Sequence, residues 1–388
     1  MSIKSKKLNR ILQRLLNERK GKMKKEDLKP SVFAVGEDYQ IMLPLSNDAL
    51  VWVKIGDEEY FDDSNGILRS STPVHRITVP QAALDEAKKY TVFCRGMVER
   101  KPYFPITEAV VEREFAFKPL KKTDDIHIYQ IADAHGRVET SAKAAAYFGD
   151  DLDILIFNGD VADHSGTPQN ICKIYETAFL ATNGGIPCVF SRGNHDLRGE
   201  YAERLAELTP NDCGRSYYTF KIGCIFGVLL DCGEDKTDDH AEYGHTICCH
   251  NFRQRETKFL KTFTGFDEKS VKYKLVINHV PISYKMPDPF DIEHEIYGDW
   301  LKTLKERYKP NLMLCGHLHR LYVSECGSEF DIYGQPCPVV VGSDPETLDK
   351  TDKDGFTGMA VTLCGDYAKI VFNDNTGAST EEQTVKIR

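Results

Sequence analysis

The amino-acid sequence predicts an α/β protein in which a small all-β sandwich domain precedes a larger α/β domain. The chain has 388 residues, which is too long for one ordinary hydrophobic core. Short alternating segments separated by turn residues occupy 31–120, whereas apolar runs alternate with helical stretches after residue 122. We therefore predict an N-terminal helix or tail at 1–30, the all-β domain at 31–120 and the α/β domain at 123–388.

The first thirty residues are basic in a chain that is acidic overall. They carry 11 Lys and Arg residues and three acidic residues, a net charge of +8, whereas the whole chain has a net charge of −9. Apolar residues recur there with the spacing of an amphipathic helix, at Leu8, Ile11, Leu12, Leu15 and Leu16. The pattern leaves open whether this segment packs on the body, stays solvated, or contacts a partner or a membrane surface. The acidic remainder argues against a broad nucleic-acid footprint.

The all-β prediction rests on five segments that are rich in β-branched and aromatic residues. They are residues 39–45, 50–55, 74–79, 90–97 and 110–117, with one short helical stretch at 81–89. These segments contain no cluster of histidines or carboxylates that would indicate chemistry. We therefore expect this domain to pack against the next one, through a linker at 117–122.

Five apolar runs in the α/β domain are typical of buried strands that are covered on both faces. These runs are residues 126–132, 153–159, 187–190, 273–278 and 312–316. The covering helices are expected at 139–148, 169–182, 200–208, 252–264 and 295–308, and further strands at 322–324, 338–341, 359–363 and 367–372. No apolar run is long enough to span a membrane, and no secretory signal follows the N-terminus, so we expect a cytoplasmic protein.

Each of the five buried runs ends beside side chains that can bind metal ions. In chain order, these motifs are Asp133-x-His135, Gly159-Asp160-x-x-Asp163, Gly193-Asn194-His195-Asp196, His279 and Gly316-His317-x-His319. Functional side chains of α/β sheets gather at the carboxyl ends of the strands, so we expect these groups at one edge. Oxygen and nitrogen donors without thiolates suit manganese, iron or zinc. Seven donors exceed the needs of one tetrahedral ion, so the sequence predicts two divalent metal ions.

The five motifs, in this order, resemble those of the calcineurin-like metallophosphoesterase superfamily: D-x-H, G-D-x-x-D, G-N-H-D/E, H and G-H-x-H. The resemblance covers about residues 123–375 and implies a two-sheet β-sandwich core flanked by helices. It also implies hydrolysis of a phosphate ester by a hydroxide that bridges the two ions. A fibronectin III-like domain in front of this core resembles the arrangement in purple acid phosphatases. Those enzymes have a tyrosine at the position of Asp163, so we expect two divalent ions here instead of a ferric–tyrosinate centre.

The resemblance also implies a role for each matching residue. It places one ion on Asp133, His135, Asp160 and His319, and the other on Asp160, Asn194, His279 and His317. Asp160 is then the bridging carboxylate. His195 is expected to give a proton or a hydrogen bond to the leaving oxygen, and Asp163 is expected to orient the His195 ring.

Substrate contacts are predicted close to the ligand motifs. Arg198 follows the loop that contains Asn194, and a guanidinium group matches phosphate oxygens in a bidentate manner. Asn194 itself is a second candidate. The loop at 231–250 follows an apolar strand and could reach the same edge, so His240 and His245 are further candidates.

The expected activity is hydrolysis of a small phosphorylated substrate, with phosphomonoesters ahead of phosphodiesters. Two alternatives stay open, a phosphodiesterase that acts on nucleotide-type diesters and a non-catalytic interaction scaffold with the same fold. The complete donor set and His195 favour hydrolysis, because a scaffold has no chemical need for seven ligands and an acid.

Overall fold

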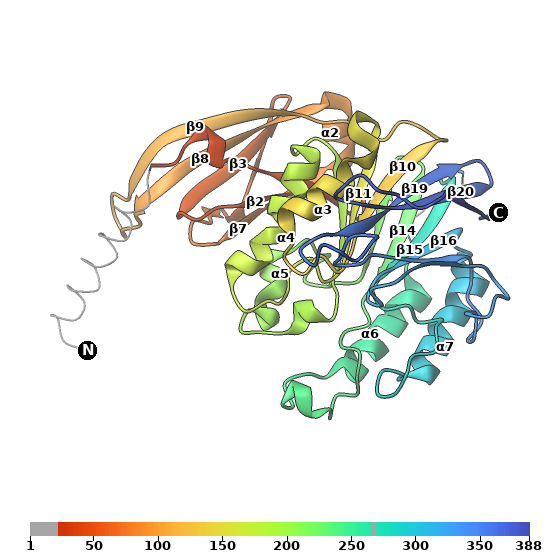
Figure 1. Cartoon of the computed structure of the whole chain (residues 1–388). Helices are drawn as coiled ribbons and strands as arrows, with labels where there is room; N and C mark the ends of the chain where they lie inside the picture. Colours follow the sequence, from red (N-terminus) through yellow and green to blue (C-terminus); the bar gives the residue numbers. More distant parts are fainter. Residues whose placement is uncertain (1–21, 265–268) are drawn as a thin grey trace.

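Two large β-sheets lie face to face between two layers of helices (Figure 1). The computed structural model describes residues 22–264 and 269–388, so the predicted amphipathic segment at 8–16 lies outside the described residues. Apolar side chains of both sheets form the central core, among them Ile128 and Ile156 of the first sheet and Leu275 and Leu314 of the second. None of the described helices is both long and apolar enough to cross a membrane.

The first sheet has nine strands in the order β21-β20-β19-β10-β11-β12-β1-β2-β7. In chain order their bounds are β1 Ser31–Val35, β2 Asp38–Pro44, β7 Val74–Pro80, β10 Ile126–Ile131, β11 Ile154–Asn158, β12 Pro187–Ser191, β19 Thr357–Cys364, β20 Tyr367–Asp374 and β21 Gln383–Lys386. Strands β10, β11, β12 and β1 run parallel. Every residue of β11 and β12 is buried, which explains their continuous apolar sequence.

The second sheet has six strands in the order β13-β14-β15-β16-β18-β17. Their bounds are β13 Tyr218–Ile222, β14 Ile225–Leu230, β15 Tyr273–Asn278, β16 Leu312–Cys315, β17 Leu321–Ser324 and β18 Val339–Gly342. Strands β14, β15, β16 and β18 are parallel, and the outer strands β13 and β17 are antiparallel to their neighbours.

Helices cover the outer face of each sheet, as Figure 1 shows. The first sheet is covered by α3 Val138–Ala145, α4 Pro168–Thr182 and α5 Leu205–Leu208, and the second by α6 Cys249–Thr262 and α7 His294–Thr303. The helix expected at 200–208 is shorter, because the Tyr201 N–H donates to the Ser165 carbonyl at 2.9 Å instead of starting a helix. Short turns of 3₁₀- or π-type lie at Lys25–Asp27, Ala146–Asp151, His195–Leu197, Ala202–Arg204, Ala241–Tyr243 and Leu304–Tyr308.

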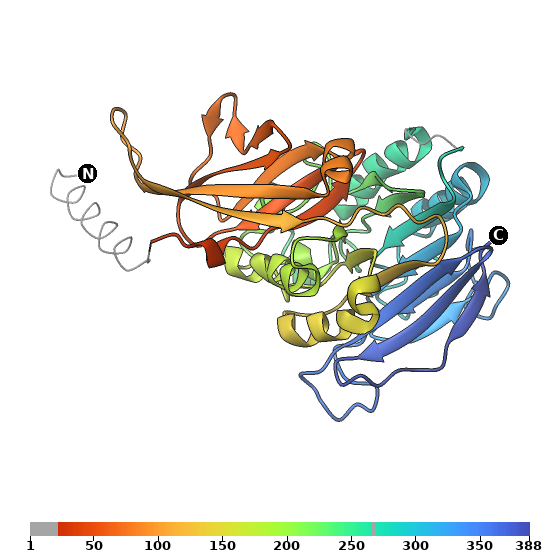
Figure 2. The same cartoon turned by 90° about the horizontal axis from the view of Figure 1, so that it is seen from above.

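The N-terminal β-rich region is divided between two sheets. Its four-stranded sheet has the order β4-β3-β8-β9, and the pair β5-β6 lies beside it. These elements are β3 Ala49–Ile55, β4 Glu58–Phe61, β5 Asp63–Ser64, β6 Ile67–Leu68, β8 Lys89–Glu99 and β9 Ile106–Ala116, with α2 Gln81–Ala87 between β7 and β8. The β8–β9 hairpin, in orange, extends outward from the body in Figure 2.

The other three N-terminal strands, β1, β2 and β7, extend the sheet of the α/β region. Val32 and Phe33 of β1 pair with Pro187 and Cys188 of β12. The sequence did not predict β1, because all five of its residues are buried and it lacks the alternation expected of a sandwich strand. The boundary predicted at residue 120 is therefore crossed by hydrogen bonds of one continuous sheet.

Candidate metal centre

The seven predicted ligands lie on loops that follow strands of both large sheets. In the first sheet, Asp133 and His135 follow β10, Asp160 follows β11 and Asn194 follows β12; in the second sheet, His279 follows β15, and His317 and His319 follow β16. The carboxyl ends of these parallel strands meet at one edge of the sandwich. Residues as far apart in sequence as His135 and His319 therefore come into contact.

Hydrogen bonds hold these loops against one another. The Asp133 N–H donates to the Gly159 carbonyl at 3.1 Å, and the Gly316 N–H donates to the His279 carbonyl at 2.9 Å. Oδ2 of Asp133 accepts from the His317 N–H at 2.8 Å, which connects the loop after β10 to the loop after β16. These hydrogen bonds fix the ligand-bearing loops of the two sheets relative to one another.

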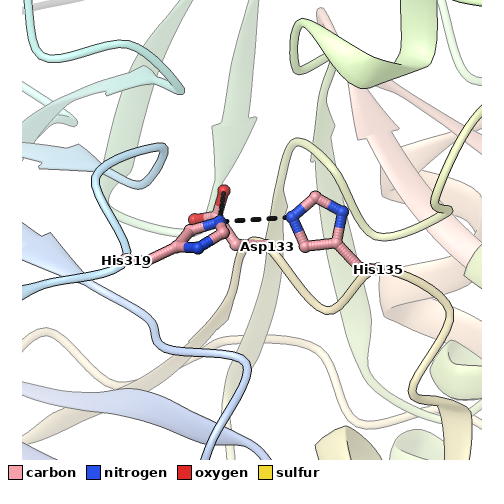
Figure 3. A group of neighbouring side chains, drawn as sticks. All are labelled: Asp133, His135 and His319. Atoms are coloured by element: carbon pink, nitrogen blue, oxygen red, sulfur yellow. Dashed lines mark hydrogen bonds and ion pairs between the residues drawn. The ribbon is translucent and has the colours of Figure 1, made fainter.

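One group of possible ligands is formed by Asp133, His135 and His319 (Figure 3). The Nε2 atoms of His135 and His319 are 3.2 Å apart, and Nε2 of His319 is 3.6 Å from Oδ1 of Asp133. Asp133 is fully buried, whereas the side chain of His319 is 44% exposed. The group therefore opens to solvent on the side of His319.

A second group consists of Asp133, Asp160 and His279, all of which are buried. Nε2 of His279 lies 3.2 Å from Oδ2 of Asp160 and 3.6 Å from Oδ1 of Asp133. Its Nδ1 lies 2.6 Å from the Asn158 carbonyl oxygen, which fixes the ring. Asp133 belongs to both groups here, whereas the family resemblance assigns the bridging role to Asp160.

Asn194 and His317 adjoin the second group. The Asn194 amide lies 3.0 Å from Nδ1 of His317. With its nitrogen turned toward the cluster, this amide donates to His317 and, at 3.2 Å, to Oδ2 of Asp160. With its oxygen turned toward them, the same amide adds an oxygen ligand beside the carboxylate and the imidazole.

The donor set fits divalent cations. Oδ1 of Asp133 is buried and has no hydrogen-bond partner among the described residues. A buried carboxylate oxygen without a partner costs free energy that a bound cation removes. The Nε2 atoms of His135 and His319 face each other at 3.2 Å, close enough for both lone pairs to reach one cation.

Burial and mutual charge set the protonation of this cluster. Burial acts to lower the pKa of His279, but Asp160 and Asp133 raise it to about 10. Burial acts to raise the pKa of Asp133, but His279 and His319 hold it well below its usual range. Burial beside His279 lowers the pKa of His317 to about 4. At neutral pH, Asp133 is therefore an anion and His317 is neutral, which are the forms that bind metals, whereas His279 carries a proton that a metal ion would have to displace.

The backbone of the cluster is strained. Among the seven predicted ligands, five have positive φ: Asp133, His135, Asp160, His317 and His319, at 51°, 45°, 52°, 70° and 48°. This region is unfavourable for residues with a Cβ, and such strain is typical of functional sites. The hydrogen bonds between the loops hold these conformations.

The glycines of the motifs make room for the neighbouring ligands. A Cβ on Gly193 would meet the Asp160 carboxylate and would lie 2.6 Å from the Asp160 nitrogen. A Cβ on Gly159 would meet the His279 ring, and one on Gly316 would lie 2.8 Å from Oδ2 of Asp133. Each glycine in these motifs therefore allows two ligand loops to approach each other.

His195 lies beside the first group, with ring centroids 4.8 Å from those of His135. Its Nδ1 is 3.2 Å from the backbone carbonyl of Asp163, whereas the prediction gave the orienting role to the Asp163 side chain. The Asp163 carboxylate is mostly exposed and lies 3.5 Å from Nδ1 of His135. A carbonyl only accepts hydrogen bonds, so it keeps a proton on Nδ1 of His195 and directs Nε2 outward.

Arg198 lies beside His195 and is paired with Glu234. Its Nη1 is 3.3 Å from Nε2 of His195. Its Nε and Nη2 donate to the two carboxylate oxygens of Glu234 at 2.8 and 2.9 Å. The guanidinium is thus placed beside His195, with Nη1 shared between His195 and Glu242.

The loop after β14 reaches the edge through Asp235 and Lys236, not through the histidines that the sequence singled out. Oδ2 of Asp235 lies 3.7 Å from Nε2 of His317, and Nζ of Lys236 lies 3.0 Å from Oδ1 of Asp235. Nδ1 of His240 accepts from the Glu242 N–H, which closes a turn within the loop. His245 is exposed. Neither histidine is among the groups that could hold a metal in the described part of the chain.

Two further residues support the ligands: Ser343, which the sequence did not single out, and Asp196, which belongs to the third sequence motif. Ser343 donates to Oδ2 of Asp133 at 2.5 Å, and it follows the buried strand β18 in the same way that the ligands follow theirs. Oδ2 of Asp196 accepts from the N–H groups of Gly193 and Asp160 at 2.8 and 3.3 Å. Burial and the nearby Asp160 raise the pKa of Asp196 to about 7. The strand-end position was the signal that would have identified Ser343.

Residues 126–321, half of the chain, match the family model of the calcineurin-like phosphoesterases, and the chain belongs to this family. The predicted resemblance is confirmed, and so is the fold class of an α/β metallophosphoesterase with a β-rich region in front. The description of this family is that of phosphoesterases.

Particular relatives are distant. The serine/threonine-protein phosphatase CPPED1 of Danio rerio is 22% identical over 151 residues, which are 38% of this chain and about half, 47%, of that protein. Purple acid phosphatase PPD1 from yellow lupin (Lupinus luteus) seeds has a TM-score of 0.59 at 10% identity, with coverage of 92% of this chain and 74% of that one. PhoD has a TM-score of 0.52 at 11% identity, with coverage of 93% and 92%.

Proposed function

We propose that this protein hydrolyses phosphomonoesters with two divalent metal ions held at the edge of the β-sandwich. The observation that carries the proposal is the convergence of donors from both sheets around the buried Oδ1 of Asp133, which lacks a hydrogen-bond partner among the described residues. Phosphatases are named among the similar proteins, which supports monoesters over diesters.

The proposed ligands divide into two sets that share a carboxylate. One set is Asp133, His135, Asp160 and His319, and the other is Asp160, Asn194, His279 and His317. When bound, two divalent ions lower the pKa of water and neutralise the charge of the phosphoryl group. Manganese, ferrous iron and zinc all suit nitrogen and oxygen donors, and Asp163 replaces the tyrosine of a ferric centre.

His195 acts on the leaving oxygen in this proposal. The Asp163 carbonyl keeps one proton on Nδ1, and Nε2 faces the Nη1 donor of Arg198. Nε2 therefore has to gain a proton and turn away from this guanidinium before it gives that proton to the departing alkoxide. Nη1 of Arg198, 3.3 Å from Nε2, offers a guanidinium donor to a phosphate oxygen at the same place. Glu234 holds this guanidinium in position, so Arg198 orients the substrate without swinging freely.

Metal removal and reloading test the proposal. The protein is stripped with a chelator, reloaded with manganese, ferrous iron or zinc, and assayed with p-nitrophenyl phosphate and its bis-ester. We expect turnover only after reloading, with higher kcat/KM for the monoester. Faster turnover of the bis-ester would identify a phosphodiesterase. If the metal-loaded protein hydrolysed neither ester, the scaffold alternative would replace this proposal.

A substitution at Asp160 tests the shared carboxylate. Asp160→Asn removes the charge that two cations would share, so we expect fewer than two metal ions per chain by elemental analysis. Asp125→Asn, the same change at an exposed carboxylate outside both ligand sets, is the matched control and keeps both ions. Two ions at full occupancy in Asp160→Asn would contradict the bridging role.

A further inference from the structure

A pocket of about 110 Å³ lies beside the candidate metal centre and has not been given a role above. It is formed by the segment that follows β15, by α7, and by Tyr333. Val280, which lines the pocket, follows His279 directly in the chain. Asp235, which lines it from the other side, reaches His317 with Oδ2 3.7 Å from Nε2. The pocket therefore adjoins two proposed metal ligands.

The walls of this pocket are mainly apolar and aromatic. Ile282, Met286, Phe290, Ile292 and Tyr284 contribute apolar surface. The polar groups at its rim are engaged with one another: the Tyr333 hydroxyl donates to Asp291 at 3.2 Å, and Asp235 accepts from Lys236 at 3.0 Å and from the Tyr243 hydroxyl at 2.9 Å. Such a lining offers little to a sugar or a second phosphate, because hydroxyls and anions need free polar partners.

No lysine or arginine is among the described residues that line this pocket, which makes it a poor site for the phosphoryl group itself. Its two carboxylates, Asp235 and Asp291, lie 3.0 Å from Nζ of Lys236 and 3.5 Å from Nε2 of His294. The phosphoryl group belongs on the proposed metal ligands, and the remainder of the ester then points toward neighbouring space. A cavity of roughly 150 Å³ accommodates benzene in other proteins, so 110 Å³ suits a short alkyl chain or part of a single ring.

We propose that this pocket binds the leaving group of the substrate, and that the preferred substrates are phosphomonoesters of small apolar alcohols or phenols. The inference rests on the proposed function, because it assigns a substrate class to the same site. It predicts that the enzyme distinguishes substrates by the apolar surface that their leaving groups bury, with each methylene in the pocket raising kcat/KM about fourfold.

A series of alkyl phosphates measures this selectivity without changing the chemistry of the leaving oxygen. Ethyl, propyl and butyl phosphate release alcohols of similar acidity, so their intrinsic reactivity is alike. We expect kcat/KM to rise about fourfold with each added methylene, and glycerol phosphate to be hydrolysed more slowly than propyl phosphate. Equal kcat/KM values across the series would overturn the proposal.

Gly298 of α7 offers a variant that adds a side chain at the mouth of the pocket. Gly298 lines the pocket and is exposed, and an added Cβ would meet nothing within 4 Å, so there is open space at this position for a larger side chain. Replacing a helical glycine also favours the helix. Gly298→Leu is expected to remove most of the advantage of butyl over ethyl phosphate. The matched control is Glu295→Leu, which places the same side chain on an exposed position of α7 outside the pocket lining.

Met286→Ala provides the opposite change. Met286 lines the pocket on a loop and is only partly buried, so its truncation enlarges the space with little effect on folding. We expect the preference to move toward longer chains, with hexyl phosphate gaining relative to butyl phosphate. The same chain-length profile in the parent, Gly298→Leu and Met286→Ala proteins would reject the pocket as the leaving-group site.

Binding of phenol alone separates this inference from the proposed function. Ligand-observed NMR with the metal-loaded protein is expected to detect phenol binding that Gly298→Leu weakens and Glu295→Leu does not. If no ester is hydrolysed but phenol binds in this way, the proposed function fails while the pocket remains an apolar binding site. If esters are hydrolysed but phenol binding and chain length are unaffected by Gly298→Leu, the proposed function stands and the pocket assignment fails.

Discussion

At the scale of single residues, the candidate site depends on backbone conformations that side chains normally avoid. Asp133, Asp160 and His317 have φ values of 51°, 52° and 70°. The sequence predicted these ligands from their position after apolar runs, but it contains no signal for positive φ. The sequence also could not predict that the carbonyl of Asp163, and not its carboxylate, contacts His195. Motif spacing does not specify which group of a residue points toward its neighbour.

Substitution of His195 is expected to slow hydrolysis without loss of the metal ions. It contacts the Asp163 carbonyl and Arg198 but belongs to neither proposed ligand set. We expect His195→Ala to keep two metal ions and to lose on the order of 10² or more in kcat, as is typical when a general acid is removed. Steady-state kinetics and elemental analysis measure the two properties. His127→Ala, which removes an imidazole that stacks on Phe148, is the control, and equal rates for the parent and His195→Ala would refute this role.

Gly193 tests how closely the ligand loops approach. Gly193→Ala places a Cβ 2.6 Å from the Asp160 nitrogen, and this contact cannot be relieved by rotation of a flexible side chain. We expect a loss of stability of about 1–3 kcal/mol, typical of overpacking, together with metal loss. Gly298→Ala, where the added Cβ meets nothing within 4 Å, should retain the metal and be at least as stable as the parent. A Gly193→Ala protein with two tightly bound ions would contradict this expectation, because the loops could then move apart without loss of the metal.

At the scale of elements, the ends of buried strands were the most informative part of the sequence. All five predicted apolar runs overlap observed strands, and the loops after them carry the donors to one edge. Sequence patterns were less informative for the loop after β14. It contributes Asp235 and Lys236, whereas His240 caps a turn within the loop, because the path of a loop depends on tertiary contacts.

Asp238 fixes this loop to the start of α6. Its two carboxylate oxygens accept from the N–H groups of Cys249 and His250 at 2.8 and 3.1 Å. We expect Asp238→Ala to lower the free energy of unfolding by about 1 kcal/mol, the usual cost of losing a helix cap. Urea denaturation measures this change. Asp238→Asn keeps an oxygen acceptor and serves as the control, and an unchanged denaturation midpoint in Asp238→Ala would mean that solvent caps the helix equally well.

At the scale of the whole molecule, three strands of the N-terminal region belong to the sheet that carries part of the candidate metal centre. Phe33 of β1 packs against Phe157 and Tyr175, with ring centroids 6.2 and 6.0 Å apart. Gln40 of β2 donates to the Asn211 carbonyl at 2.7 Å and accepts from the Asn211 N–H at 3.1 Å. Local alternation in the sequence could indicate strands in 31–120, but pairing between β1 and β12 is a long-range contact that no local pattern contains.

Phe33→Ala measures whether the two regions unfold together. Phe33 is fully buried, and removing such a ring typically costs about 3–5 kcal/mol. We expect one calorimetric transition at a lower temperature than in the parent, with loss of activity at the same temperature. Tyr103→Ala, on the tip between β8 and β9 where the side chain is 81% exposed, should leave the transition unchanged. Two separate transitions, with only the first shifted, would instead indicate independent folding.

The position of β1 beside β12 also constrains the order of events during synthesis of the chain. Val32 pairs with Pro187, so more than 150 residues must leave the ribosome before this first strand finds its parallel neighbour. Until then β1 has only β2 as a partner, and its other edge stays open to incorrect pairing. The outer edge of β1 therefore stays unpaired in the nascent chain until β12 emerges.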